Sequence, residues 1–185
     1  MKTGLVLVDI QKDYFPGGRM ELVGISEAGQ KAGELLDVFR DHDWPTFHIQ
    51  HLSTHQGATF FLPDSEGVEI HECIQPLSDE LVIQKHYPNS FRETTLLEEL
   101  RKKDIKKVVI CGAMSHMCID ATARAAFDFG FECLVIQEAC ATRNLEFGGK
   151  TILAEQVHGA FMAALGAAYA GVVTVEEFKS STLSG

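Results

Sequence analysis

The sequence predicts a three-layer α/β/α domain built around a parallel sheet of six strands. Short apolar runs recur along the chain, and segments with helical spacing separate them. An apolar run without alternation is typical of a strand that is buried on both faces, as in a parallel sheet covered by helices. Regular alternation of such strands with helices indicates a doubly wound α/β domain.

The first half of the chain supplies three strands and one helix. Residues 5–8 form an unbroken apolar run, and residues 46–52 form a second strand set off by Trp44-Pro45. Residues 81–83 form a third strand. Between the first two, residues 26–40 have helical spacing, with Leu35, Leu36 and Phe39 on one face. Residues 53–77 are the least regular part, and we expect a loop there that shapes a pocket.

The second half continues the alternation. Helices are expected at residues 94–102, 117–129 and 149–165, and the second of these ends at Gly130. Strands are expected at residues 108–110, 133–136 and 171–174. No linker or internal repeat interrupts the pattern, so residues 1–185 are predicted to form a single domain.

Composition narrows the functional class. The formal net charge is −10, which argues against nucleic acid as a partner because a phosphate backbone requires a basic face. The five cysteines are odd in number and none has CxxC spacing, so reduced thiols are expected rather than disulfides or zinc ligands. The sequence has no signal-peptide pattern and no membrane-length apolar run, so a cytoplasmic location without membrane contact is expected.

Three predicted strands end in chemically active side chains. Asp9 follows the first strand, Lys85 follows the third, and Cys118 lies a few residues after the fourth. In doubly wound sheets, ligands bind beyond the carboxyl ends of the strands. The sequence therefore predicts that a carboxylate, an ammonium and a thiol meet at one edge of the sheet.

Cys118 is expected to be a nucleophile. It lies three residues past Ser115, a residue suited to cap the following helix. The first turn of a helix and a nearby lysine both favour the thiolate, so a lowered thiol pKa is expected. A nearby carboxylate can take the thiol proton and return it to a leaving amine.

Each of these residues also has a simpler interpretation. A single cysteine is more often a small buried apolar residue than a nucleophile. An aspartate after a strand often caps a loop, and most lysines are exposed to solvent. The joint placement of Asp9, Lys85 and Cys118 at one edge favours a catalytic function over three independent structural roles.

Three segments resemble the isochorismatase-like cysteine hydrolase superfamily, which includes amidohydrolases related to isochorismatase and nicotinamidase. The opening segment LVLVDIQKDYF at residues 5–15 resembles the family's first motif. The segment VIQKHYPNSF at residues 82–91 and the segment CGAMSHMC at residues 111–118 are similar to its second and third motifs. They occur in the family's order and together cover residues 3–145, which makes the resemblance specific.

The resemblance implies a catalytic triad of Asp9, Lys85 and Cys118. It also implies a cis peptide between Ala113 and Met114, with the backbone N–H groups of Met114 and Cys118 facing an oxyanion. It further implies six strands in a Rossmann-like order, a thioester intermediate on Cys118 and a homodimer or larger homo-oligomer. No cofactor is implied, and the expected partner is a small-molecule substrate with a C–N bond of the amide type.

At two places this chain differs from the motifs of particular branches of the family, and these differences indicate which branch it resembles. Nicotinamidases have an Asp-x-His metal motif after the second strand, where this chain has His51 and Ser53, so no metal is expected. Isochorismatases that cleave a vinyl ether have glycine in place of Cys118, although Ser115-His116 resembles that branch. Amide hydrolysis is therefore favoured, while vinyl ether hydrolysis remains the alternative.

Several side chains are expected to line the substrate pocket. Aromatic residues in loops near the proposed site can form an apolar wall, although ordinary packing explains any one of them equally well. The candidates are Phe15, His51, Phe60, Tyr87 and His116. A nucleotide-binding module is disfavoured because no G-x-G-x-x-G follows the first strand. A non-catalytic assembly protein with the same fold stays open, and the substrate itself is not predicted.

Overall fold

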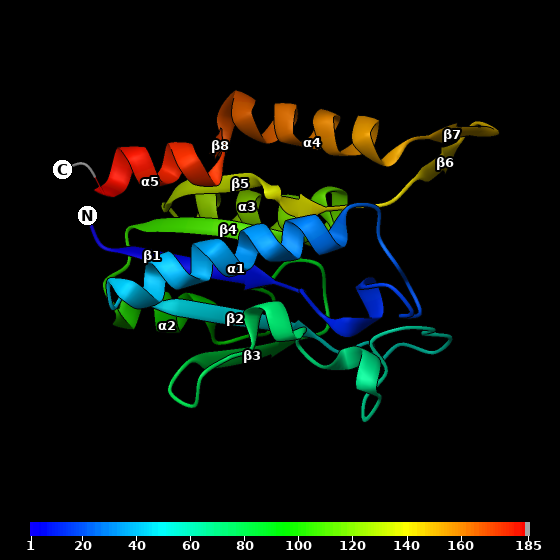
Figure 1. Ribbon diagram of the computed structural model, residues 1–185, viewed down its shortest axis with the longest axis horizontal. Coiled ribbons are helices and arrows are strands. Elements are labelled where there is room, and N and C mark those ends of the chain that lie inside the picture. Colours follow the sequence, from blue (N-terminus) through cyan, green and yellow to red (C-terminus); the bar gives the residue numbers. More distant parts are fainter. Residues whose placement is uncertain (184–185) are drawn as a thin grey trace.

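A six-stranded parallel sheet forms the centre of the molecule in the computed structural model, which describes residues 1–183 (Figure 1). The strand order is β3-β2-β1-β4-β5-β8, and each neighbouring pair is parallel. The predicted three-layer fold with six parallel strands is confirmed. The strands are β1 (Thr3–Val8), β2 (Thr46–His51), β3 (Leu81–Lys85), β4 (Lys107–Ala113), β5 (Glu132–Ala141) and β8 (Gly171–Val173).

The strand order reverses direction between β1 and β4. From β1 the chain builds outward to β2 and β3, and it then returns to add β4 on the other side of β1. At such a switch point the following loops leave in opposite directions and open a crevice at the carboxyl ends of the strands. The segments carrying Asp9 and Cys118 leave β1 and β4 at this place.

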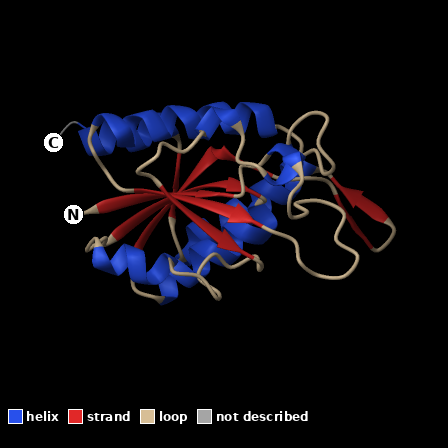
Figure 2. Cartoon of the chain, turned by 90° about the horizontal axis from the view of Figure 1, so that it is seen from below, coloured by secondary structure: helices blue, strands red, loops and turns tan. Residues whose placement is uncertain are grey.

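Helices cover both faces of the sheet, as the edge-on view in Figure 2 shows. Helix α1 (Ile25–Asp41) packs against β5 and against α5 (Val175–Leu183). Helix α3 (Asp120–Asp128) packs against β5 and α4 (Ala154–Ala168), and α4 also contacts the edge strand β8. Helix α2 (Leu96–Lys102) precedes β4. The apolar side chains of the central strands are almost fully buried between these layers.

The region predicted as one helix at residues 149–165 begins differently. An antiparallel hairpin of β6 (Leu145–Phe147) and β7 (Lys150–Ile152) comes first, and α4 starts only at Ala154. The hairpin turns at Gly148 and Gly149, which both have positive φ, and such a glycine pair is suited to a two-residue turn. The prediction was wrong at this boundary because these glycines form the turn between two paired strands rather than the start of a helix.

The predicted helix at residues 117–129 is also divided. A π-helical turn at Ser115–Ile119 precedes α3, and its capping residue is Met114 rather than Ser115. The Ser115 hydroxyl forms hydrogen bonds elsewhere, at 2.9 Å from Nδ1 of His158 and 3.3 Å from the carbonyl of Ala141. The proposed Ser115 cap was therefore wrong, because this side chain links the turn to α4 and β5.

The predicted irregular segment at residues 53–77 contains only two 3-10 turns, η2 (Glu66–Val68) and η3 (Glu72–Ile74). It is held against the short turn η1 (Lys12–Tyr14) through the buried carboxylate of Asp13. Asp13 accepts hydrogen bonds from the backbone N–H groups of Phe61, at 2.6 Å, and Arg19, at 3.2 Å. This anchoring brings an aromatic loop next to the carboxyl end of β1.

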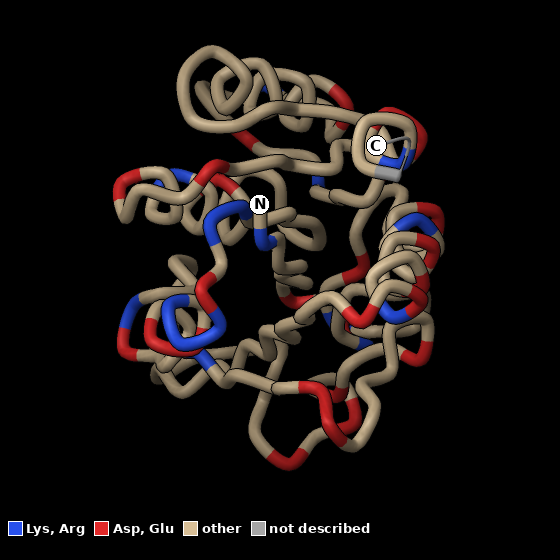
Figure 3. Tube along the Cα trace, turned by 90° about the vertical axis from the view of Figure 1, so that its left-hand side faces the viewer, with Lys and Arg blue, Asp and Glu red and all other residues tan. Residues whose placement is uncertain are grey.

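Acidic and basic residues are interspersed along the helices and loops of the chain trace in Figure 3. No helix within residues 1–183 combines the length and the apolar composition needed to cross a membrane.

Candidate active site

Asp9, Lys85 and Cys118 lie together at the switch point of the sheet. The Nζ atom of Lys85 is 2.7 Å from Oδ2 of Asp9 and 3.3 Å from Sγ of Cys118. Asp9 and Lys85 are fully buried, and Cys118 is 5% exposed to solvent. The structure thus brings a carboxylate, an ammonium and a thiol from three strand ends into direct contact.

A glycine at the end of β4 allows this convergence. Gly112 pairs with Val8, the last residue of β1, and has a φ of 125°. A Cβ atom at this position would lie 2.0 Å from the carbonyl oxygen of Val8, so only glycine fits. The end of β4 therefore approaches the end of β1 closely enough to place Cys118 beside Asp9.

The backbone after Gly112 turns sharply into the π-helical segment. The Ala113–Met114 peptide bond is cis. The carbonyl of Met114 then accepts hydrogen bonds from the backbone N–H groups of Met117, at 3.0 Å, and Ile119, at 3.2 Å. These contacts fix the turn that carries Cys118.

Lys85 has two further partners, which are both neutral. Its Nζ atom is 2.9 Å from Nδ1 of His51 and 3.0 Å from the carbonyl oxygen of Tyr87. Burial by itself would lower the pKa of Lys85, but the negative charge of Asp9 beside it outweighs burial and raises that pKa. Lys85 is consequently a charged ammonium at neutral pH.

The thiol of Cys118 behaves differently from the sequence-based expectation. Burial raises its pKa, the carboxylate of Asp9 raises it further, and Lys85 only partly offsets the two. The expected lowering of the pKa was wrong, because the depth of burial was not visible in the sequence. The resting form is a neutral thiol beside a carboxylate that has spare acceptor capacity, since neither Asp9 oxygen has a partner with hydrogen-bond geometry among the described residues.

Tyr14 is a neighbour of the site that the sequence reasoning did not single out. Its side chain is buried, and burial together with the nearby negative charge of Asp9 raises the pKa of its hydroxyl. Its ring packs against Phe61, at 4.6 Å between centroids, and against Phe60, at 5.9 Å. The position of Tyr14 inside the first motif was the signal that could have identified it.

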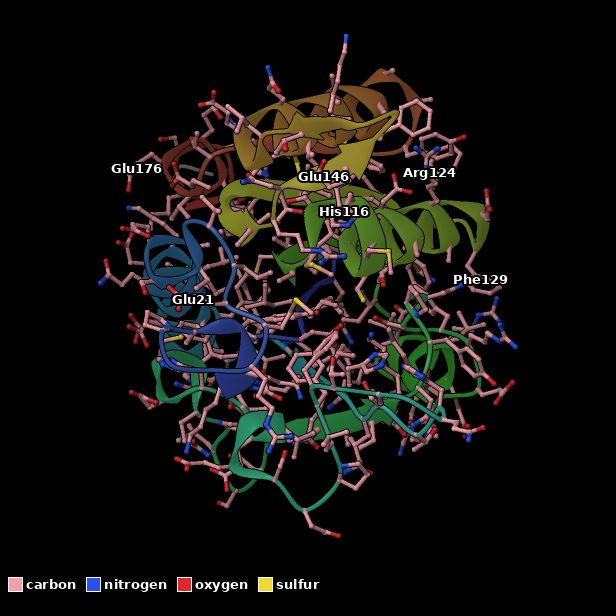
Figure 4. All side chains as sticks on the ribbon, turned by 90° about the vertical axis from the view of Figure 1, so that its right-hand side faces the viewer. Glu21, His116, Arg124, Phe129, Glu146 and Glu176 are labelled. Atoms are coloured by element: carbon pink, nitrogen blue, oxygen red, sulfur yellow. The ribbon has the colours of Figure 1, made fainter. Side chains whose placement is uncertain are left out.

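Among the other predicted pocket residues, His51 and Tyr87 form hydrogen bonds with the triad residue Lys85. His51 is the partner of Lys85 described above, and Phe60 belongs to the Tyr14 cluster. His116 lies near the middle of the view in Figure 4 and is hydrogen bonded through Nδ1 to Oγ1 of Thr142 at 2.6 Å. Tyr87 contributes its carbonyl, while its ring lies under the guanidinium of Arg92 at 3.5 Å.

Phe15 does not face the triad. Its ring stacks on His71, with 3.5 Å between centroids, and lies next to Gly29 of α1. Phe15 and His71 line a separate cleft of about 640 Å³, whose lining includes none of the triad residues. The interpretation of Phe15 as a pocket residue was wrong, because its backbone turns the ring toward α1 while Tyr14 turns toward Cys118.

The spacing of Asp9, His51 and Cys118 by itself resembles a metal site, because their ligand atoms lie within 4.8 Å of one another. The ammonium of Lys85 contacts all three atoms, at 2.7, 2.9 and 3.3 Å, and so occupies the position between them. His48 points away from this group toward Glu80, at 3.0 Å, and His55 is exposed. His48, His51 and His55 are close in the sequence, but their side chains do not surround a common point where a metal ion could bind.

Comparisons with known proteins identify the family of this chain. The Isochorismatase domain model matches residues 3–177. The chain is 51% identical to the isochorismatase family protein YddQ of Bacillus subtilis, over 96% of this chain and 99% of that protein. It is 27% identical to a maleamate amidohydrolase of Pseudomonas putida, over 77% and 74% of the two chains.

Solved structures show the same relationship. The crystal structure of an isochorismatase hydrolase from Oleispira antarctica superposes with a TM-score of 0.92 at 48% identity, and the match covers 96% of this chain and 95% of that one. With the matching domain, the shared fold and the two relatives near 50% identity, the chain belongs to the isochorismatase family of hydrolases.

Proposed function

We propose that the protein hydrolyses a C–N bond of the amide type in a small molecule, with Cys118 as the nucleophile and a thioester as the intermediate. The observation that carries the proposal is the direct contact of the buried Lys85 ammonium with both Asp9 and Cys118. This arrangement supplies a base, a nucleophile and a fixed positive charge at one place.

The first half of the reaction forms the thioester. Asp9 takes the proton of Cys118, and Lys85 stabilises the thiolate so formed. The sulfur attacks the substrate carbonyl, and the backbone N–H groups of Met114 and Cys118 donate to the oxyanion. Asp9 then gives its proton to the leaving nitrogen, the C–N bond breaks, and ammonia or an amine departs.

The second half regenerates the enzyme. Asp9, again a carboxylate, takes a proton from water, and the hydroxide attacks the thioester carbonyl. The C–S bond breaks, the carboxylic acid product leaves, and Asp9 returns its proton to the sulfur. Lys85 keeps its charge throughout, so its contribution is electrostatic.

A cationic side chain near the site favours substrates that also carry a carboxylate. Arg143 lies just beyond the end of β5, and its positive charge acts on Tyr14 and His116. Its guanidinium is exposed, donates a hydrogen bond to Sδ of Met20 at 3.9 Å and forms no ion pair with a carboxylate within residues 1–183. An anionic group on the substrate could pair with it.

A screen for ammonia release tests the proposal. The panel contains neutral primary amides and matched amides that carry a carboxylate, and the variants are Cys118→Ala and the control Cys73→Ala. Replacing the nucleophile should abolish release, a loss of about a thousandfold or more, whereas Cys73→Ala should retain it. Hydroxylamine should trap the acyl group of the thioester. Equal ammonia release from the Cys118→Ala protein would refute the mechanism.

Arg143→Gln provides the test of substrate class. It should raise KM for the anionic amides by about tenfold or more and leave KM for neutral amides nearly unchanged. Arg19→Gln, which changes another exposed arginine, is the matched control. An equal effect on both kinds of amide would remove the argument for a carboxylate on the substrate.

A further inference from the structure

The ammonium of Lys85 has more neighbours than it has protons. It carries three N–H donors, but four acceptor atoms surround it. Its hydrogen bonds go to Nδ1 of His51 at 2.9 Å, the carbonyl of Tyr87 at 3.0 Å and the sulfur of Cys118 at 3.3 Å. Asp9 lies at 2.7 Å as an ion-pair partner outside hydrogen-bond geometry. The bond to sulfur is the longest of the three, and it is the bond that strengthens when the sulfur becomes a thiolate.

The negative charge moves during the first step of the proposed reaction. When Asp9 takes the thiol proton, the carboxylate becomes neutral and the sulfur becomes negative. The Asp9 contact to Lys85 then weakens while the Cys118 contact strengthens. His51 and the Tyr87 carbonyl carry no charge in either state, so their two bonds to Lys85 persist.

We infer that His51 is a positioning residue: its imidazole, together with the Tyr87 carbonyl, anchors Lys85 while negative charge passes from Asp9 to the sulfur of Cys118. The inference rests on the function proposed above. His51 acts through Lys85 and needs no contact with the reacting carbonyl. It also gives Lys85 an acceptor without adding a second carboxylate to the buried site.

The anchor requires an unprotonated Nδ1 on His51. The titratable groups around its ring are Lys85 on β3, Asp9 after β1 and Cys118 in the π-helical turn, and His86 and His55 in the adjoining loops also act on it electrostatically. Burial, followed by the charge of Lys85, lowers the pKa of His51 to about 4. The imidazole is therefore neutral above that pH, with its proton on Nε2 and the lone pair of Nδ1 turned to Lys85.

Gln11 holds the backbone of His51 in place. Its side-chain amide accepts from the backbone N–H of His51 at 2.8 Å and donates to the carbonyl of His51 at 2.9 Å. The ladder between β1 and β2 ends at the pair Val8 and Ile49, so the fully buried amide of Gln11 continues the pairing beyond the end of β1. A third bond, from Gln11 to the carbonyl of Val68 at 2.7 Å, ties the irregular loop to the same point.

The test compares His51→Leu with His51→Asn in the full chain. Leucine cannot accept from Lys85, whereas the amide oxygen of asparagine can replace Nδ1 and does not titrate. The readout is the rate of iodoacetamide alkylation at Cys118, measured by peptide mass spectrometry from about pH 4 to pH 9. His55→Leu, at an exposed neighbouring histidine, is the matched control, and circular dichroism follows folding.

We expect His51→Leu to slow alkylation of Cys118 at neutral pH by about tenfold. Without the hydrogen bond to His51, the ammonium of Lys85 is no longer held in place beside the sulfur. His51→Asn should restore the rate at neutral pH to within about threefold, because its amide oxygen can accept from Lys85. A wild-type rate in His51→Leu would overturn the inference, as would an Asn variant as slow as the Leu variant. If the Leu variant fails to fold, an Asn variant that folds but is alkylated about tenfold more slowly than the wild type at neutral pH overturns it.

Labelling requires no substrate, so this result is separable from the proposed function. A protein that releases no ammonia from any amide but shows the expected labelling pattern would refute the amidase proposal alone. Turnover of amides with no effect of His51→Leu on labelling would refute the positioning role alone.

Discussion

The buried ion pair of Lys85 and Asp9 is the residue-scale feature on which the chemistry depends. Both side chains are fully buried, and their 2.7 Å contact joins the base to the residue that stabilises the thiolate. A buried charge without its partner is expensive, so the two residues also depend on each other for folding. Function and stability are therefore coupled at this pair.

Replacing Asp9 by asparagine should affect both properties. We expect kcat to fall by about a thousandfold because the base is lost. The free energy of unfolding should fall by about 3–5 kcal/mol because the Lys85 charge remains buried without a counter-charge. Urea unfolding and amide turnover measure the two effects, with Asp128→Asn at the end of α3 as the control. An active, fully stable Asp9→Asn protein would contradict the assignment of Asp9.

The sequence was sufficient to identify the residues of the candidate site, but it did not predict their protonation behaviour. Asp9, Lys85 and Cys118 could be selected because strand ends in a parallel sheet share one edge. The pKa of Cys118 was expected to be lowered, yet burial raises it. Depth of burial depends on loops far away in the sequence, and the same reason explains why Phe15 was chosen where Tyr14 is the neighbour of Cys118.

At the scale of elements, the two strands β1 and β4 and the turn after β4 position the nucleophile. Gly112 permits the close approach of these strands, since a side chain there would meet the backbone of Val8. Six strands and the main helices were predictable from apolar runs, because periodicity is a local property. The hairpin β6–β7 and the π-helical turn were not, because both depend on backbone geometry that periodicity does not report.

Gly112→Ala tests the role of this approach. The new Cβ atom would lie 2.0 Å from the Val8 carbonyl oxygen at a φ of 125°, so the end of β4 must move. We expect a loss of about 3 kcal/mol or more in the free energy of unfolding, together with loss of activity. Gly130→Ala has a φ of 88° but open space around the new Cβ atom, so it should cost only about 1 kcal/mol and leave activity intact. Equal losses of stability and activity in the two variants would contradict the claim that Gly112 is needed for the close approach of β4 to β1.

At the scale of the whole molecule, buried histidines and an acidic network make stability depend on pH. Burial lowers the pKa of His48 and lowers that of His51 to about 4. Glu80 lies between Arg40 and His48; although burial would raise its pKa, the hydrogen bond and charge of Arg40 lower it to about 2. All three groups bind protons less readily in the folded chain than in the unfolded chain.

The free energy of unfolding should therefore fall as the pH is lowered. The His51 contribution is lost between the unfolded pKa of 6.5 and the folded value of about 4, and the Glu80 contribution is lost from 4.5 toward about 2. We expect His51 alone to account for roughly 2–3 kcal/mol, which His51→Asn should remove and the exposed-site control His55→Asn should not. Urea unfolding across this pH range provides the measurement, and a stability that rises on acidification would show that the sign is wrong.

The surface around α4 leads us to expect a homo-oligomer. Within α4 the exposed residues after Gln156 are uncharged and mostly small, and the hairpin that precedes α4 extends from the body with Phe147 79% exposed (Figure 1). Apolar surface of this kind is usually covered in solution. Light scattering should give at least twice the monomer mass of 20.4 kDa, and Ala164→Glu should reduce it, whereas Lys179→Glu on α5 should not. A monomer at all concentrations would contradict this expectation.

The most direct test of the central claim is the alkylation rate of each of the five cysteines in the native protein. If Asp9 and Lys85 activate Cys118, iodoacetamide should modify this buried cysteine faster than the more exposed Cys73, and Asp9→Asn should remove the advantage. If Cys73 reacts first while Cys118 stays unmodified, and Asp9→Asn changes nothing, then the three residues are a structural cluster and the account of the site is wrong.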